Sequence, residues 1–544
     1  MPEISVVLGL LVAVALLALV ARRLDVPYPI VLVLGGLAIA LVPGLPRVEL
    51  APEVVFLVFL PPLIYSAGWF TSVRDFKANL RPIGLLAVGL VLFTIVGIAY
   101  LTHALVPELP WPACFALGAI VAPTDAVAAT ALFQRIGVPR RIVTVLEGES
   151  LLNDASGLIA YRFAVLSVAA GFSIWEAGAA FVVASAGGIA LGLVMAWLLF
   201  QVQRRIEDPG VEITLSFLVP YAIYLAAVGI TEATHNAVPV SGVLAVAAAG
   251  IYTGRRSSEM LSATTRIQAF AVWEVLLFVL NGLVFILIGL QLPAIRAGLD
   301  GQSVGELVGI ALLISLALIA LRFAWVFPAT YLPRFLSRRV RQRDPYPGWR
   351  NVVVVAWTGM RGVVSLAAAL SLPRQFPGRD LLLLVTFVVI LVTLVVQGLT
   401  LPALLRALGI GEDGSAMEEE LEARTRSIEA ALTRLEELAV EDWTRDDTVA
   451  YMQHYYGKRR KTVDTRFGRL DHEHTEEGHQ HEAGLDHVEA HRAHLDGSNR
   501  LRRELLAAER ASLLALRNSG VIGDEVLHRV ERDLDLEEIQ LAGA

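Results

Sequence analysis

The sequence predicts an all-α polytopic membrane protein with about 13 transmembrane helices and a helical tail in water. Hydrophobic residues make up 55% of its 544 residues, charged residues only 18%, and the mean hydropathy is +0.61. Soluble globular chains are less apolar than this. The charge is also uneven, because residues 1–410 carry a net +6 and residues 411–544 a net −13. We therefore expect a transmembrane domain over 1–410 and a cytosolic, acidic, His-rich helical domain over 411–544.

Apolar segments long enough to cross a bilayer, which takes about 20 residues, recur along the first domain. They cover residues 4–21, 27–43, 51–69, 82–106, 111–133, 142–171, 177–201, 211–231, 236–253, 269–291, 304–333, 351–372 and 381–408. The first follows Met1, Pro2 and Glu3 rather than the basic residues of a signal peptide. We expect it to be retained as a helix.

Basic residues in the loops predict the orientation in the membrane. Alternate loops carry 19 of them: Arg22, Arg23, Arg74, Lys77, Arg81, Arg135, Arg140, Arg141, Arg204, Arg205, Arg255, Arg256, Arg266, Arg334, Arg338, Arg339, Arg341, Arg343 and Arg350. The opposite loops carry only Arg47, Arg296, Arg374 and Arg379. The bias predicts a multi-pass protein of the plasma (inner) membrane, with its N-terminus outside and its tail in the cytosol.

Segment 111–133 contains Pro123, Thr124 and Asp125 at membrane depth. Proline removes a backbone donor and frees the carbonyl four residues before it. In lipid, such freed groups persist only where they line a cavity or find another partner. The motif favours an interrupted helix whose ends face a cation cavity, although a simple proline kink remains open. The intramembrane carboxylate of Asp125 favours function.

Segment 142–171 carries the densest polar group, which contains Glu149, Ser150, Asn153 and Asp154. Glu149 and Asn153 are four residues apart, as are Ser150 and Asp154, so each pair shares a helical face. A dehydrated alkali cation requires hard oxygen ligands, and a carboxylate can bind a proton instead. The group predicts an antiport site, while for Glu149 a structural ion pair is the preferred interpretation.

Segment 351–372 places Arg361 between Gly359 and Gly362. An arginine in lipid needs an acid, which Glu149 or Asp125 could supply. Segments 111–133 and 351–372 are each the fifth of a block of six, with one segment between the blocks. This arithmetic predicts two inverted six-helix repeats with corresponding interrupted helices.

The motifs together resemble the monovalent cation:proton antiporter family, which includes bacterial NhaP-type and animal NHE-type exchangers. The resemblance covers residues 1–410 in order and rests on four motifs: Leu60-Pro61-Pro62-Leu63 with Phe76-Lys77-Ala78-Asn79, Pro123-Thr124-Asp125, Glu149-Ser150 with Asn153-Asp154, and Gly359-Met360-Arg361-Gly362. It implies a homodimer with crossed, unwound helices that works by an elevator-like movement.

The resemblance also implies roles for the site residues. Asp154 would bind the cation or the proton, Asn153 would assist it, and Ser150 and Thr124 would be further oxygen ligands for sodium. Asp125 would compensate the ends of the half-helices, and Glu149 would form a structural ion pair with Arg361. An Asn-Asp pair resembles the electroneutral branch of the family.

The chain departs from the family pattern at Ser66, where many relatives have an acid. That difference puts the ion preference among sodium, lithium and potassium in doubt. Two arginines, Arg162 and Arg322, also lie in membrane segments, and Arg162 could pair inside the core, snorkel toward the surface or lie at a different depth. Glu274 and Asn281, which share a helical face, could line a passage or join helices.

The tail contains two amphipathic helical patterns, one from Met417 to Leu438 and one over residues 498–541. Eight of the 11 histidines lie in or between them: His454, His472, His474, His479, His481, His487, His491 and His494. Histidine can sense pH or bind metals, but the spacing favours a solvated charged segment.

These observations predict a secondary active sodium:proton antiporter that is not an enzyme, requires no cofactor and binds no nucleic acid. Its expected partners are membrane lipid and a second copy of the chain. The alternatives are a potassium:proton antiporter, a cation channel and a membrane sensor of pH or salt. The single cysteine, Cys114, excludes an intrachain disulfide.

Overall fold

The computed structural model describes residues 2–43, 50–170, 174–206, 208–235, 238–299, 304–411, 414–467 and 488–543. Throughout these ranges the regular secondary structure is helical, and the chain forms two compact units. The first, called the membrane unit here, contains Met1–Leu261 and Gln268–Glu412. The second, the tail unit, contains Ser262–Ile267 and Asp413–Ala544.

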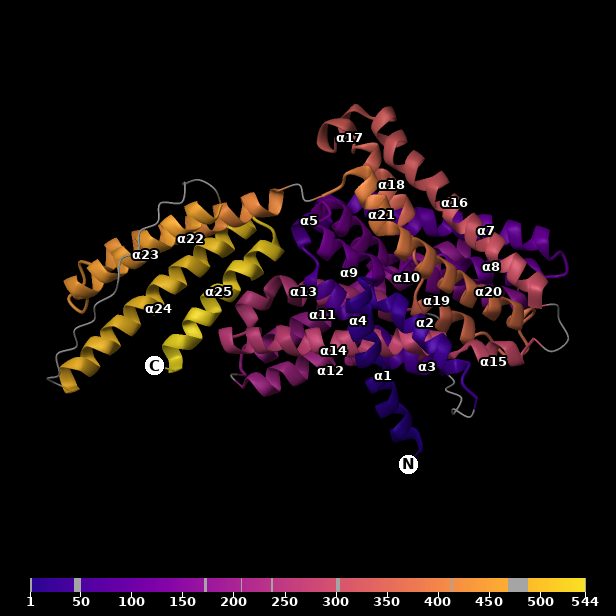
Figure 1. The fold of residues 1–544 in the computed structure, drawn as a ribbon, viewed down its shortest axis with the longest axis horizontal. Helices are drawn as coiled ribbons and strands as arrows, with labels where there is room; N and C mark the ends of the chain where they lie inside the picture. Colours follow the sequence, from indigo (N-terminus) through magenta and orange to yellow (C-terminus); the bar gives the residue numbers. More distant parts are fainter. Residues whose placement is uncertain are drawn as a thin grey trace. The chain divides into compact units, whose positions relative to one another are not determined.

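Each predicted apolar segment corresponds to one helix or to consecutive helices (Figure 1). In chain order these are α1 (Pro2–Leu24), α2 (Tyr28–Ala40), α3 (Pro52–Val54) with η1 (Val55–Phe59) and α4 (Leu60–Phe70), α6 (Leu80–Gly84) with η2 (Leu85–Leu90) and α7 (Val91–Leu105), α8 (Trp111–Val121) with α9 (Val127–Ile136), α10 (Arg140–Ala170), α11 (Ile174–Gln203), α12 (Pro209–Ala233), α13 (Gly242–Met260), α14 (Ala263–Leu290), α16 (Val304–Leu336), α18 (Trp349–Trp357) with α19 (Val363–Leu370), and α20 (Arg379–Val392) with η3 (Thr393–Gln397) and α21 (Gly398–Leu408). The short helices α5 (Val73–Ala78), α15 (Leu292–Ala297) and α17 (Arg338–Arg343) lie between them in the chain. The predicted all-helical fold is therefore confirmed, while the number of crossings and the inverted repeats stay predictions.

Many of these helices are both long enough and apolar enough to span a bilayer. Among the described residues, eight stretches of at least 18 residues qualify, and α2 and α8 are shorter apolar helices. Their outer faces are apolar as well, since α1 alone exposes Leu8, Val12 and Leu16. A soluble chain does not expose so much apolar surface, so this is a multi-pass membrane protein.

Two of the predicted segments are interrupted helices. Residues 122–126 separate α8 from α9, and residues 358–362 separate α18 from α19. The first break contains Pro123, which cannot donate a backbone hydrogen bond, and the second contains Gly359 and Gly362, which weaken a helix. The sequence correctly predicted both interruptions.

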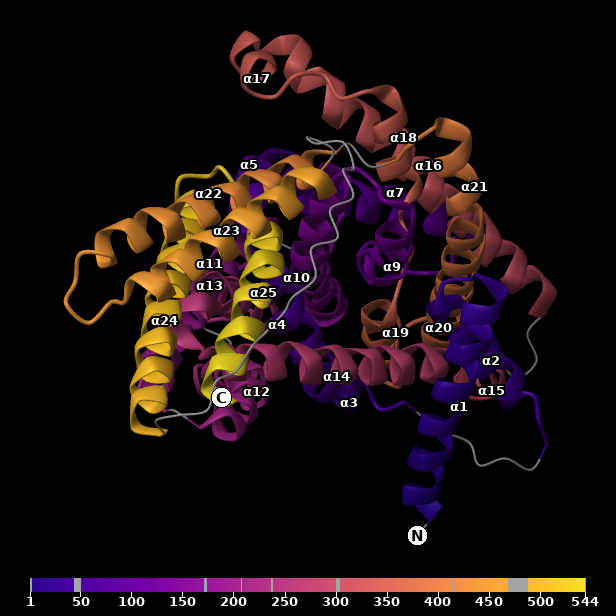
Figure 2. The same cartoon turned by 60° about the vertical axis from the view of Figure 1, so that its left-hand side comes forward.

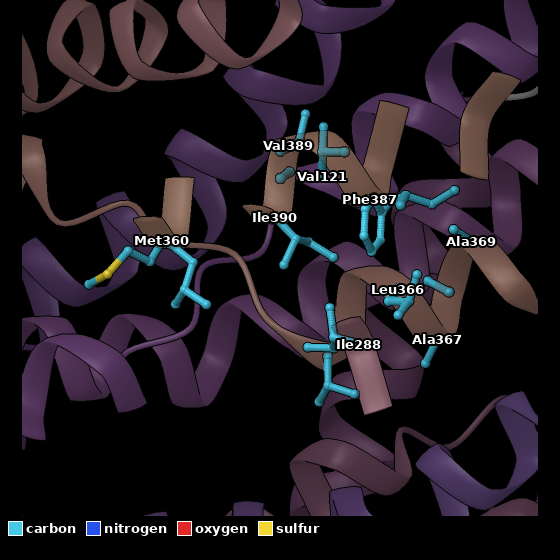
Figure 3. Packing of buried hydrophobic residues seen from close by; sticks show 14 of the residues in the cluster. Val121, Ile288, Met360, Leu366, Ala367, Ala369, Phe387, Val389 and Ile390 are labelled. Atoms are coloured by element: carbon cyan, nitrogen blue, oxygen red, sulfur yellow. The ribbon is translucent and has the colours of Figure 1, made fainter. Parts of the chain in front are cut away.

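Apolar side chains pack tightly around these breaks. Figure 3 shows Val121, the residue before the first break, and Met360, which lies in the second break, together with Ile390 of α20 and Leu366 of α19. All four side chains are fully buried or nearly so. Ile288 of α14 belongs to the same cluster. The non-helical backbone is thus enclosed by protein rather than by lipid, as backbone at membrane depth must be.

The tail unit is a bundle of helices that lie side by side in both views (Figures 1 and 2). In its described part these are α22 (Ser415–Leu438), α23 (Asp446–Arg466), α24 (Val488–Asn518) and α25 (Asp524–Gly543). Two apolar clusters hold it together, one centred on Leu513 and Val530 and the other on Leu435 and Met452. Both predicted amphipathic patterns are helical, whereas the histidines from His472 to His487 lie outside the described residues.

Candidate functional site

The two helix breaks meet inside the membrane unit. The amide of Asp125 in the first break donates a hydrogen bond to the carbonyl oxygen of Met360 in the second, at 2.8 Å. Gly362 lies directly against Asp125, and a Cβ atom on that glycine would be 2.0 Å from the Asp125 Oδ2 atom. The predicted crossing of discontinuous helices is therefore present, and it requires a residue without a side chain at position 362.

We expect the Gly362→Ala substitution to separate the two breaks and to abolish transport. The added methyl group overlaps a carboxylate that is fixed by its own hydrogen bonds, so the backbone itself must shift. The measurement is cation-dependent proton flux together with the melting temperature in detergent. Gly84→Ala is the matched control, because nothing lies within 4 Å of its added Cβ atom. Normal flux in Gly362→Ala would contradict the tight crossing.

Charged side chains compensate the backbone ends that the breaks create. The Asp125 Oδ1 atom accepts a hydrogen bond of 2.9 Å from the amide of Val127, at the start of α9. The guanidinium of Arg361 donates from Nε to the carbonyl of Val121, the last residue of α8, at 2.7 Å, and from Nη1 to the carbonyl of Gly359. The carboxylate of Asp125 thus faces the positive N-terminal end of α9, and the guanidinium of Arg361 faces the negative C-terminal end of α8. Both arrangements are favoured by the helix dipole.

Helix α10 brings its polar face against the first break. The Asn153 Nδ2 atom donates to the hydroxyl of Thr124 at 2.8 Å and to its carbonyl oxygen at 3.1 Å. The Ser150 hydroxyl accepts from the amide of Ala126 at 3.3 Å. These contacts need a close approach, and Gly157 allows it, since a Cβ atom there would be 2.3 Å from Pro123. The structure therefore brings Thr124, Ser150 and Asn153 together.

Glu149 pairs with a different arginine from the expected one. Both of its carboxylate oxygens accept hydrogen bonds from Arg322 of α16, at 2.5 and 2.7 Å, and Oε1 also accepts the Thr124 hydroxyl at 2.9 Å. The predicted partner, Arg361, donates instead to backbone carbonyls. The pairing of Glu149 with Arg361 was thus wrong, because the geometry of the breaks turns Arg361 toward the end of α8.

Sequence reasoning undervalued Arg322, although a signal was present. It is the single charged residue between Leu307 and Pro333, and an isolated charge in an apolar run needs a partner. In the structure its side chain is 2% exposed, and its Nε atom also donates to the carbonyl of Val355 at 3.1 Å. Arg322 thus joins α16 to both α10 and α18.

Asp154 differs from the other acids of this region. It is half-buried on α10, one turn after Ser150, and close enough to Asp125 for the two carboxylates to repel each other. Its carboxylate has no hydrogen bond or ion pair with any residue that the structure describes. The neighbouring residue, Asn153, has a buried Oδ1 atom that likewise finds no hydrogen-bond partner among the described residues. Asp154 thus differs from Asp125 and Glu149, whose carboxylates accept hydrogen bonds within the described structure.

Two other polar residues that the sequence singled out are Ser66 and Glu274. The hydroxyl of Ser66 donates to the carbonyl of Leu63 in its own helix, at 2.9 Å. Glu274, which sequence analysis suggested could line a passage or join helices, is exposed. These positions add no oxygen ligand to the group around the breaks.

Known proteins resemble this chain over most of its length. The sequence pattern of the family described as "Sodium/hydrogen exchanger, transmembrane" matches residues 9–407. A relative from Mycobacterium bovis, named as an uncharacterized Na+/H+ exchanger, is 35% identical over 99% of this chain and 97% of its own length. A "Sodium, potassium, lithium and rubidium/H+ antiporter" of Bacillus pumilus is 36% identical over 74% of this chain and 61% of its own length.

The fold of the chain is also similar to that of solved structures. The sodium proton antiporter MjNhaP1 from Methanocaldococcus jannaschii matches with a TM-score of 0.61, over 75% of this chain and all of that one, at 19% identity. That likeness shows the fold, and the sequence relatives show the family, which is one of transporters rather than enzymes. This chain belongs to the sodium/hydrogen exchanger family of monovalent cation:proton antiporters.

Proposed function

We propose that the chain exchanges one sodium ion for one proton across the membrane, and that both compete for the carboxylate of Asp154. The observation that carries the proposal is that Asp154 alone among the acids at the crossed breaks has no partner in the described structure. Glu149 is held by Arg322, and Asp125 by the amide of Val127. A carboxylate left open at membrane depth favours ion transport.

The charges around the breaks support a one-to-one exchange. Three carboxylates (Asp125, Glu149 and Asp154) stand against two guanidinium groups (Arg322 and Arg361). One negative charge is left over when Asp154 is ionised. A single monovalent cation or a single proton neutralises it, so both loaded states carry the same charge. Equal charge in the two states is the condition for electroneutral antiport.

Nearby oxygen atoms supply the remaining ligands that an alkali cation needs. The Asn153 Oδ1 atom is buried and has no hydrogen-bond partner in the part of the chain that the structure describes, and the Ser150 hydroxyl uses one of its two lone pairs on the Ala126 amide. Thr124 is more heavily committed, because its hydroxyl donates to Glu149 and accepts from Asn153. We therefore infer that Asn153 and Ser150 assist Asp154 directly, while Thr124 chiefly fixes Asn153 in position.

The test measures proton flux in liposomes that contain the purified protein. An acid-inside pH gradient is imposed, and sodium, lithium, potassium or choline chloride is then added outside. We expect sodium to dissipate the gradient at a rate that does not change when potassium and valinomycin clamp the membrane potential. A rate that follows the potential would contradict the one-to-one exchange. Equal rates with choline would contradict cation antiport itself. The four cations in the name of the Bacillus pumilus relative make the comparison of ions essential.

We further propose that the N-terminus faces outward and the tail the cytosol, and that the protein acts as a homodimer in sodium and pH homeostasis. The 19-to-4 bias of basic residues between alternate loops supports the orientation. The likeness to the NhaP fold supports an elevator-like movement around the crossed breaks. Crosslinking of single cysteines in native membranes tests the dimer, and their labelling from either side tests the orientation.

A further inference from the structure

The membrane unit contains a second polar site, near the first residues of α10 and the last residues of α16. A pocket opens there between α6 and η2, the first turns of α10, the last turns of α16, and α18. Three arginines line it: Arg81, Arg141 and Arg334. All three belong to the arginine-rich loops that predict the cytosolic face.

One carboxylate holds the three arginines together. Asp344 accepts hydrogen bonds from the Nη2 atoms of Arg81 at 2.7 Å, Arg141 at 2.6 Å and Arg334 at 2.7 Å. Burial acts to raise the pKa of Asp344, but the hydrogen bonds from Arg141 and Arg334 hold that pKa below its usual value. Asp344 is therefore ionised at neutral pH, and the cluster keeps two uncompensated positive charges. Its Arg81 Nε atom is buried and has no hydrogen-bond partner in the described structure.

Apart from Thr330 and Asn351, the rest of the pocket lining is apolar. Its wall includes Leu85, Val145, Val326, Ala329 and Val355, beneath the arginines. A small soluble anion gains nothing from such a wall, whereas a molecule with a charged head and a hydrocarbon chain can use both parts.

Aromatic residues beside the pocket indicate its depth in the membrane. Tyr346 and Trp349 are 45% and 58% exposed, and Tyr346 stacks on Tyr331 of α16 with ring centroids 6.2 Å apart. Exposed tyrosine and tryptophan gather where lipid headgroups begin. Phe335 and Leu336 at the end of α16 are more than 70% exposed and would lie in the same layer. The pocket is thus at the level of the phosphates.

We propose that this pocket binds an anionic glycerophospholipid of the cytosolic leaflet, with its phosphate on the partly exposed Arg81 and Arg141 and part of an acyl chain on the apolar wall, while the buried Arg334 adds its charge from behind. The charge complementarity and the apolar lining favour this class of ligand over zwitterionic lipid. The bound lipid bridges α10, which carries Asp154, to α16, which carries Arg322. The site does not depend on the proposed ion exchange.

Native mass spectrometry of the delipidated full-length protein tests the proposal. The probes are phosphatidylglycerol, phosphatidylcholine with the same acyl chains, and inorganic phosphate. We expect phosphatidylglycerol to bind at least about fivefold more tightly than phosphatidylcholine, and Arg81→Gln to remove most of that preference. Arg339→Gln on α17 is the matched control, because that exposed arginine does not line the pocket.

A second variant tests the contribution of the apolar wall separately from that of the arginines. Ala329→Phe fills the apolar wall and leaves all three arginines in place, so we expect it to weaken phosphatidylglycerol binding as well. Equal binding of both lipids, or no loss in either pocket variant, would overturn the proposal. Displacement of the lipid by millimolar inorganic phosphate would also overturn it, because the ligand would then be a free anion. Failure of ion exchange in liposomes would not affect the lipid-binding result, because the two experiments measure different properties.

Discussion

We expect the Asp154→Asn variant to lose cation-dependent proton exchange completely while it folds as well as the native protein. Asparagine cannot take up a proton or carry the negative charge that attracts the cation. The charges of Asp125 and Glu149 are then balanced by Arg322 and Arg361, so no net charge remains for a sodium ion. The fold survives because the described structure gives the Asp154 side chain no hydrogen-bonding partner to lose. Flux in proteoliposomes and the melting temperature in detergent measure the two effects.

A control must remove a carboxylate without touching the site. Glu108→Gln does so in the exposed loop between α7 and α8, and we expect unchanged flux. Asn153→Ala is the informative neighbour, because it removes the unpartnered Oδ1 atom and leaves Asp154 intact. We expect it to raise the sodium concentration for half-maximal flux more than it lowers the maximal rate. Appreciable exchange in Asp154→Asn would place the exchanging group elsewhere.

The interrupted helices could be predicted from the sequence because their causes are local. Pro123 removes a backbone hydrogen bond wherever it stands in a helix, and two glycines within four residues weaken any helix. An acid or an arginine at membrane depth is also visible without a structure, because its cost in lipid does not depend on its neighbours. These rules identified Asp125, Asp154 and Arg361 as exceptional residues of the apolar segments.

The pairing of the charges could not be predicted, because it depends on distances between helices. Two arginines, Arg322 and Arg361, could each neutralise Glu149, and spacing in the sequence does not order them. The fold decides, because the second break points the Arg361 guanidinium at the carbonyl end of α8 while α16 brings Arg322 alongside α10. Similarly, the sequence suggests the hydroxyl of Thr124 as a ligand for the cation. In the structure this hydroxyl instead donates a hydrogen bond to Glu149 and accepts one from Asn153.

The ion pair of Glu149 with Arg322 gives the second large expected effect. We expect Arg322→Met to destabilise the protein by about 3–5 kcal/mol, because it leaves the buried carboxylate of Glu149 without its counter-charge. We expect Glu149→Gln to reduce the stability by a similar amount, because it leaves the buried guanidinium of Arg322 without its counter-charge. The glutamine still offers an oxygen that accepts the hydrogen bond of the Thr124 hydroxyl. Reversible unfolding in sodium dodecyl sulfate mixed micelles measures both. The double variant should be more stable than either single one, since no uncompensated charge remains.

The exposed pair of Arg426 with Glu422 in the tail is the matched control for this cycle. Its atoms are 2.8 Å apart, much like the buried pair, but its side chains are 54% and 42% exposed. Water screens such a pair, so we expect a coupling of about 0.5 kcal/mol or less there. A similarly small coupling between Glu149 and Arg322 would show that the buried pair is not what holds α16 to α10. A large coupling energy would show that Glu149 is fixed in its ion pair with Arg322. Asp154 would then remain as the carboxylate that can exchange its ion.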